Sequence, residues 1–226
     1  METETLLALR VSATVAAAAT ALSLPFAIAT AAWLARTPSR ARAALSFVSL
    51  LPLVLPPVVT GYALLLLFGR HGPLAAMGLH IAFTWWGAVV AAAVIAFPLE
   101  VATLRATFAV LGRTHEEVAM TLGATPVEAF RRVTLPLALP GILAAAALAF
   151  ARALGEFGAT LVLAGSIEGE TRTIALAIYR MLELPERTGE LHALLFLSIA
   201  LAAGAVLASE GLLRWQERRM RGGHGR

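Results

Sequence analysis

Arg152 and Glu156 are the two residues whose types and spacing most clearly suggest chemistry. They stand four positions apart inside a long apolar stretch, a spacing that places both side chains on one face of a helix. An unpaired charge inside a membrane is costly, so we expect the two to pair with each other or across a subunit interface. Two uses stay open: a structural salt bridge within a bundle, and a gate that opens only when the pair rearranges.

The composition gives little support for covalent catalysis or for a metal site. The chain has no cysteine, and its histidines (71, 80, 115, 192 and 224) are scattered, without two at metal-ligand spacing. It also lacks the G-x-x-x-x-G-K-[ST] phosphate loop, so any ATP must be handled by another chain. We therefore expect no catalytic residue, no metal site and no cofactor bound by this chain.

A second feature is the dipeptide Pro56-Pro57, midway through another apolar stretch. Proline cannot continue the helical hydrogen-bond ladder, so the helix is predicted to break there and restart. A restarted half-helix presents free N–H groups and the positive end of its dipole. Thr60 adds a hydroxyl, and Gly61 permits close approach. A proline kink used only for packing is the other interpretation.

The elements that must hold these residues are membrane spans. Of the 226 residues, 59% are apolar, against about 45–50% in soluble domains. Crossing a bilayer takes roughly 20 apolar residues. The stretches that meet this length are Leu6–Leu34, Ala43–Phe68, Ala75–Leu104, Leu137–Gly165 and Leu191–Leu213. The sequence thus predicts an all-α, polytopic bundle of about five transmembrane helices, forming a single domain over residues 1–226.

The distribution of positive charge predicts the orientation. Every basic residue is an arginine, and the arginines gather in residues 36–42, 105–132 and 214–226, which five spans would place on one side. By the positive-inside rule this side is cytoplasmic, with the amino terminus outside and the carboxyl terminus inside. The acidic start is unlike a cleaved signal peptide, so the first span is expected to remain. Because the arginines follow topology, no nucleic acid is expected as partner.

A polar stretch between the third and fourth predicted spans, residues 114–136, has the signals of two short helices. Thr114 with Glu117 fits a capping box, and Gly123 follows where a left-handed residue would end the first helix. Thr125 and Glu128 repeat the box, with Pro126 at the first helical position. The sequence therefore predicts a helix-turn-helix elbow on the cytoplasmic side.

Three uses of the elbow can be compared. A DNA-reading helix needs a basic face that the elbow does not offer, and its tethers hold it against the bilayer. An ordered connecting loop is the plainest interpretation. A docking surface for a cytoplasmic partner is the third: small residues would permit close approach and apolar ones would supply contact area. The residues concerned are Val118, Ala119, Leu122, Gly123, Ala124 and Phe130.

The same stretch carries a known signature. Residues 117–136 match the EAA pattern E-A-A-x3-G-x9-I-x-L-P, with Val118 and Val133 as conservative departures, and in this they resemble the permeases of bacterial ABC importers. Three further segments resemble molybdate ABC transporter permeases, with sulfate and tungstate permeases as close relatives. These are "LPPVVTGYALLLLFGRHGPL" at 55–74, "RALGEFGATLVLAG" at 152–165 and "EGETRTIALAIY" at 168–179.

The resemblance implies a type I ABC importer permease of MetI-like architecture. In that family the EAA region forms a coupling loop, here 114–136, that sits in a cleft of a separate ATP-binding subunit. The coupling residues it implies are Glu117, Ala119, Leu122, Gly123 and Ala124. It also implies a homodimer of permease chains, a pair of ATP-binding subunits that hold ATP and magnesium, and a bacterial inner-membrane location.

A tetrahedral oxyanion offers only hydrogen-bond acceptors, and removing its water is costly unless donors replace it. Several neutral donors would let it pass, which directs attention to hydroxyls and free amides at membrane depth. The resemblance attaches "GEFGAT" (residues 155–160) to the pore region. The pathway or gate candidates are therefore Thr60, Gly61, Arg152, Glu156, Gly158 and Thr160.

The segment 166–190, predicted to lie outside, carries mixed charge. Such charges are commonly only solvated. The family, however, receives substrate from a soluble oxyanion-binding protein that docks on this side, and mixed charge suits a transient, steered interface. The docking candidates are Glu168, Glu170 and Arg172.

The sequence thus favours the membrane subunit of an ATP-driven molybdate importer, with a sulfate or tungstate importer as the alternative. A self-sufficient ion-coupled secondary transporter is more remote, because no internal repeat is evident and buried ionisable residues are few. A membrane scaffold without transport would have no use for a broken span beside an Arg–Glu pair.

Overall fold

The computed structural model describes residues 2–36, 40–183 and 188–222, and every regular element within these ranges is a helix. The predicted all-α fold is confirmed. The helices are α1 (Glu2–Arg36), α2 (Arg40–Val54), α3 (Pro57–Phe68), α4 (Pro73–Ala76), α5 (Trp85–Leu111), α6 (Thr114–Thr121), α7 (Pro126–Ala129), α8 (Leu135–Leu154), α9 (Gly158–Ala164), α10 (Ile174–Leu182) and α11 (Thr188–Gly222). A π-helical turn, Phe130–Thr134, joins α7 to α8.

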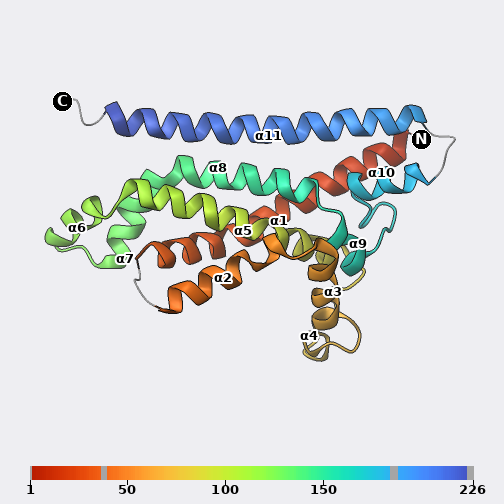
Figure 1. The fold of residues 1–226 in the computed structure, drawn as a ribbon, viewed down its shortest axis with the longest axis horizontal. Coiled ribbons are helices and arrows are strands. Elements are labelled where there is room, and N and C mark those ends of the chain that lie inside the picture. Colours follow the sequence, from red (N-terminus) through yellow and green to blue (C-terminus); the bar gives the residue numbers. More distant parts are fainter. Residues whose placement is uncertain (1, 37–39, 184–187, 223–226) are drawn as a thin grey trace.

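The long helices α1, α5, α8 and α11 lie side by side and form the body of the molecule (Figure 1). Helix α5 packs against both α1 and α8, and α11 packs against α8. The buried core is rich in alanine, and small side chains let helices approach closely in a membrane. Gly141 of α8 is one such position, since a Cβ atom there would overlap the Thr107 side chain of α5.

In the described part of the chain, four helices are long and apolar enough to cross a membrane, namely α1, α5, α8 with its preceding turns, and α11. The second predicted span is a bent pair rather than one rod. Helices α2 and α3 meet at an angle of 113°, with the break at Leu55 and Pro56. The predicted interruption at Pro56-Pro57 is confirmed. Helices α3 and α4 project from the body formed by the long helices (Figure 1), and α3 packs against α9.

The third span differs from its predicted bounds of Ala75–Leu104. Helix α4 ends early, followed by Gly78 with φ +89°, a backbone conformation that glycine adopts without steric cost. The long helix α5 then begins at Trp85, where the Thr84 hydroxyl accepts a hydrogen bond from the Gly87 amide at 3.3 Å. The predicted span Ala75–Leu104 is therefore not one helix: it contains a turn, a short loop and the capped start of α5.

The fourth predicted span, Leu137–Gly165, is also interrupted. Helix α8 ends at Leu154, residues 155–157 form a break, and the short helix α9 follows. Arg152 and Glu156 therefore do not share one helix face as predicted, because Glu156 lies beyond the end of α8. The fifth predicted span, Leu191–Leu213, lies within α11.

The two ends of the bundle carry different features (Figure 1). The end of α1, the elbow of α6 and α7, and the carboxyl-terminal part of α11 lie at one end, so the described parts of the arginine-rich regions gather there. Helix α10 and the amino terminus lie at the other end. Within the predicted outside segment 166–190, residues 184–187 lie outside the described residues.

Candidate functional site

The elbow between α5 and α8 is an ordered turn between two short helices. Helix α6 is followed by Gly123 with φ +95°, the left-handed residue that the sequence predicts. The second capping box is confirmed: the Thr125 hydroxyl accepts from the Glu128 amide at 3.3 Å, and the Glu128 carboxylate accepts from the Thr125 amide at 3.0 Å. The elbow is thus held by its own hydrogen bonds.

The first predicted capping box is wrong. Helix α6 begins at Thr114 itself, and the residue before it, Arg113, already has helical dihedral angles of φ −112° and ψ −8° and makes no side-chain cap. The Thr114 hydroxyl therefore cannot act as the cap, and the Glu117 carboxylate is free for another contact. Glu117 is exposed.

One face of the elbow is apolar and open to solvent. Leu122 is 85% exposed, and Val118 and Val127 are also exposed. Among the other predicted coupling residues, Gly123 is exposed, while Ala119 and Ala124 are half-buried. An exposed apolar surface of this kind, rimmed by polar residues, is typical of a protein interaction site.

The opposite face of the elbow is anchored by Glu116, a residue that the sequence reasoning missed. Its carboxylate is buried and accepts hydrogen bonds from the Arg36 guanidinium at the end of α1 and from the Thr134 hydroxyl at the start of α8. The Arg36 guanidinium also stacks over the Phe130 ring, 4.4 Å from its centroid. A cavity of about 170 Å³ opens beside this cluster, between α1, α5 and α6.

Four of the predicted pathway residues meet where α3 crosses α9. A Cβ atom on Gly61 would lie 2.7 Å from the Cα of Ala159, and one on Gly158 would lie 3.1 Å from the Cβ of Pro57. The backbones of the two helices can touch because these positions are glycine. Thr60 and Thr160 are both buried, and their hydroxyl oxygens have no hydrogen-bond partner within the part of the chain that the structure describes.

The charged pair lies next to this crossing. Arg152 donates to Glu156 at 3.0 Å within the same chain. Glu156 is 2% exposed, and its second oxygen accepts from the Ala159 amide in the first turn of α9 at 2.9 Å. Glu156 therefore holds the start of α9 in place, which supports the structural interpretation of the pair.

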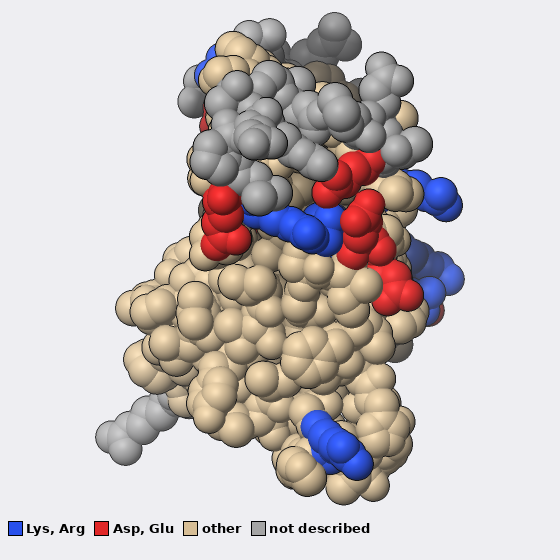
Figure 2. Space-filling view, turned by 90° about the vertical axis from the view of Figure 1, so that its right-hand side faces the viewer, with Lys and Arg blue, Asp and Glu red and all other residues tan. Residues whose placement is uncertain are grey.

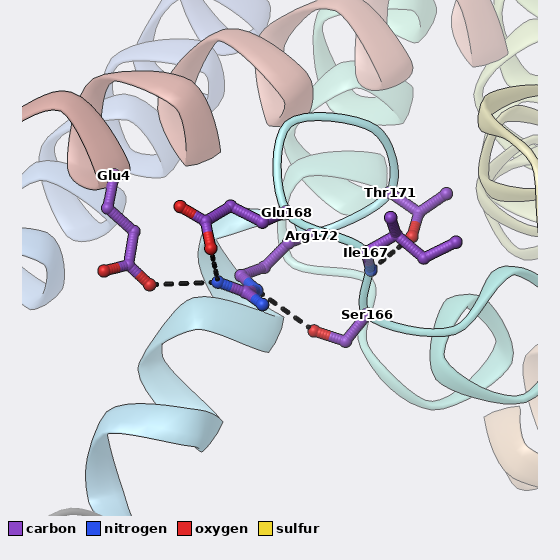
Figure 3. Close-up of polar contacts among 6 residues, drawn as sticks. All are labelled: Glu4, Ser166, Ile167, Glu168, Thr171 and Arg172. Carbon is purple, nitrogen blue, oxygen red and sulfur yellow. Dashed lines mark hydrogen bonds and ion pairs between the residues drawn. The ribbon is translucent and has the colours of Figure 1, made fainter.

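The loop between α9 and α10 folds around Thr171 (Figure 3). The Thr171 hydroxyl accepts from the Ile167 amide at 2.9 Å and donates to the Gly165 carbonyl at 3.3 Å. The Ile167 carbonyl accepts from the Glu170, Thr171 and Arg172 amides. This compact loop exposes Glu168 and Glu170.

Arg172 is buried, whereas the sequence predicts an exposed docking residue at this position. It is 4% exposed, and its guanidinium donates to Glu4 at 2.9 Å, to Glu168 at 3.1 Å and to Ser166 at 3.4 Å (Figure 3). Arg172 thus ties the loop to the start of α1. On this end of the molecule, charged side chains form a band above a broad uncharged surface (Figure 2).

A second carboxylate missed by the sequence reasoning lies within α5. Glu100 is fully buried and accepts a hydrogen bond at 2.9 Å from Ser23 of α1. The signal was a single glutamate inside an apolar span, which marks a position of interest in a membrane helix. Here it links α1 to α5.

Comparison with known proteins identifies the family of this chain. Residues 23–222 match the family of the binding-protein-dependent transport system inner membrane component. The chain belongs to this family. The match includes the elbow, the crossing of α3 and α9, and the loop that Arg172 anchors. Members work with a binding protein and an ATPase, so these two kinds of partner are implied for this chain.

Individual relatives match almost the full length. The molybdenum transport system permease protein ModB of Escherichia coli (strain K12) is 45% identical over 212 residues, which are 92% of this chain and 93% of that protein. The ModB protein of Haemophilus influenzae is 41% identical over 218 residues, 94% of this chain and 95% of that protein. The ModB protein of Mycobacterium tuberculosis is 44% identical over 209 residues, 91% and 77% respectively.

The structure sorts the predicted site residues into three separate groups. The coupling candidates lie on the elbow at one end of the bundle, and the docking candidates lie on the loop at the other end (Figure 1). The pathway candidates, with Arg152 and Glu156 included, gather around the start of α9.

Proposed function

We propose that this chain is the transmembrane subunit of an ATP-driven importer that carries molybdate, or a related tetrahedral oxyanion, across the bacterial inner membrane. The observation that carries the proposal is the elbow with its exposed apolar face, in a chain of the binding-protein-dependent family. The ModB relatives, which cover more than nine-tenths of this chain, support molybdate. Family membership also favours this function over an ion-coupled secondary transporter.

The elbow would dock in a cleft of the ATP-binding subunit. Leu122 and Val118 supply apolar area, and exposed Glu117 supplies a charge at its edge. Gly123 and the adjoining alanine at 124 keep the turn narrow enough for close approach. ATP and magnesium would be bound by that partner, and closure of two such subunits would push two elbows, one from each copy of a permease homodimer.

The crossing of α3 and α9 would line the path of the anion. Thr60 and Thr160 provide buried hydroxyls that no other described residue engages in a hydrogen bond, and such donors are what an oxyanion needs after losing water. The Val59 and Thr60 amides donate to the Pro56 carbonyl, so what the start of α3 adds is the positive end of a helix dipole. Neutral donors bind a dianion weakly enough to release it.

The loop of residues 165–172 would receive the oxyanion-binding protein. Glu168 and Glu170 are exposed on a loop held rigid by Thr171 and Arg172, and exposed charge steers transient encounters. This assignment places the loop outside and the arginine-rich end in the cytoplasm, in agreement with the positive-inside rule.

The test uses the complete complex in lipid vesicles: permease, ATP-binding subunit and binding protein. ATP hydrolysis is measured with the binding protein loaded with molybdate, tungstate or sulfate. We expect molybdate to stimulate hydrolysis and to enter the vesicles. Stimulation by sulfate alone would assign the chain to the sulfate branch, and hydrolysis unaffected by any loaded binding protein would contradict the importer itself.

A further inference from the structure

Glu116 joins three elements that are distant in the sequence. Its Oε1 atom accepts hydrogen bonds from Arg36, at the end of α1, and from Thr134, at the start of α8, while its own backbone belongs to α6. In the described part of the chain, Arg36 is the residue of α1 that forms an ion pair with the elbow. One carboxylate oxygen thus connects the elbow to α1 and to α8.

The surroundings of this contact make it selective for one geometry. The Glu116 side chain is 7% exposed and that of Arg36 is 28% exposed, so water competes little for the carboxylate. The Arg36 guanidinium lies over the Phe130 ring, and Phe130 in turn packs on Phe108 of α5, with ring centroids 6.1 Å apart. A planar guanidinium that both stacks and donates has little freedom to shift.

The neighbouring glutamate has the opposite environment. Glu117 is exposed on the face that carries Val118 and Leu122, whereas Glu116 points toward the bundle. Two adjacent acidic residues therefore divide two tasks on successive faces of α6. One is available to a partner outside the chain, and the other attaches α6 to the spans.

We propose that Glu116 is the positioning residue that makes the elbow move as one body with α1 and α8. This inference rests on the proposed docking of the elbow to an ATP-binding subunit. A push on α6 reaches α8 directly through the chain, but it reaches α1 only across non-covalent contacts. The Arg36–Glu116 ion pair transmits the movement of α6 to α1, and the Thr134 hydroxyl holds the Glu116 carboxylate in position. Without the pair, ATP hydrolysis would continue, but α1 would no longer move together with α6 and α8.

The experiment measures, in vesicles holding the assembled complex, the ratio of molybdate taken up to ATP hydrolysed. The variants are Glu116→Gln, Arg36→Gln and the double variant, each normalised to the amount of ATP-binding subunit that co-purifies. A purely structural defect lowers the amount of complex but leaves this ratio unchanged. The matched control is Glu210→Gln, which removes the charge of an exposed pair with Arg214 on α11.

We expect each single variant to lower the ratio by about fivefold or more, the size typical of an allosteric coupling. The double variant should lower it no further, because the two residues act through each other, and Glu210→Gln should keep the wild-type ratio. An unchanged ratio in Glu116→Gln would overturn the inference. So would a double variant whose loss in the ratio equals the product of the two single losses.

Two further outcomes are distinguishable. If Glu116→Gln does not assemble, Arg36→Gln is measured alone: a lowered ratio supports the ion pair, and an unchanged ratio overturns it. Failure of the proposed function would look different. In that case the wild-type chain would bring down no ATP-binding subunit, and substitutions at Leu122 would have no effect on assembly.

Discussion

Gly61 of α3 and Ala159 of α9 lie in direct backbone contact: a Cβ atom at Gly61 would be 2.7 Å from the Cα and 2.8 Å from the carbonyl oxygen of Ala159. Neither atom belongs to a flexible side chain that could turn away. The close crossing of α3, which carries Thr60, and α9, which carries Thr160, therefore depends on the absence of one methyl group.

Gly61→Ala should separate α3 from α9. Overpacking of this kind costs roughly 1–3 kcal/mol, so we expect a lower midpoint of thermal unfolding in detergent and reduced transport. Gly155→Ala is the control, since its Cβ would lie 3.9 Å from the nearest atom. Equal unfolding midpoints for the two variants would contradict the close crossing.

Thr60→Val and Thr160→Val test the unused hydroxyls. Each substitution removes a buried hydroxyl that has no hydrogen-bond partner among the described residues, so unfolding midpoints should stay the same or rise. Transport should fall about tenfold, the effect of losing one hydrogen bond to a charged group. Thr20→Val, whose hydroxyl is bonded to the Ala16 carbonyl, should transport normally. Normal uptake by both pathway variants would argue against their contact with the anion.

Glu156→Ala should be more damaging than Arg152→Lys. The first substitution leaves the Ala159 amide without its acceptor, and an unsatisfied buried donor costs about 1–3 kcal/mol. The second keeps a cation beside Glu156, so thermal stability and transport should remain near wild type. Loss of transport in Arg152→Lys with unchanged stability would instead favour a gate whose geometry needs arginine.

Glu170→Arg should weaken docking of the binding protein. Glu170 is exposed, whereas Glu168→Arg would also place a second cation beside Arg172. The measurement is the affinity of the loaded binding protein at low and high salt. We expect a loss that shrinks as salt screens the charges, with the ATP-binding subunit still attached. An unchanged affinity at low salt would contradict the assignment of this loop.

Local signals in the sequence predicted much of the elbow and the broken span. Pro56-Pro57, Gly123 and the Thr125–Glu128 box each act over a few residues, and each was confirmed. Thr114 carried the same signal as Thr125 but failed, because the backbone at the residue before it is already helical.

The remaining features depend on contacts that no local pattern encodes. Glu116 and Arg36 are separated by 80 positions, and the sequence alone does not say which of two adjacent glutamates turns inward. The local sequence likewise predicts that Arg172 is an exposed charge, but in the fold the start of α1 brings Glu4 into contact with it. Long-range packing decides which charges anchor the fold and which are free for partners.

The most direct test of the account is whether the ATP-binding subunit co-purifies with Leu122→Glu. Leu122 is 85% exposed, so the substitution should leave the fold intact while placing a charge in the centre of the docking face. The control is Leu182→Glu, an exposed leucine on α10 at the other end of the molecule. We expect Leu122→Glu to lose about tenfold or more of the bound ATP-binding subunit and Leu182→Glu to retain it. Equal recovery of the subunit with both variants would contradict the elbow as the coupling site.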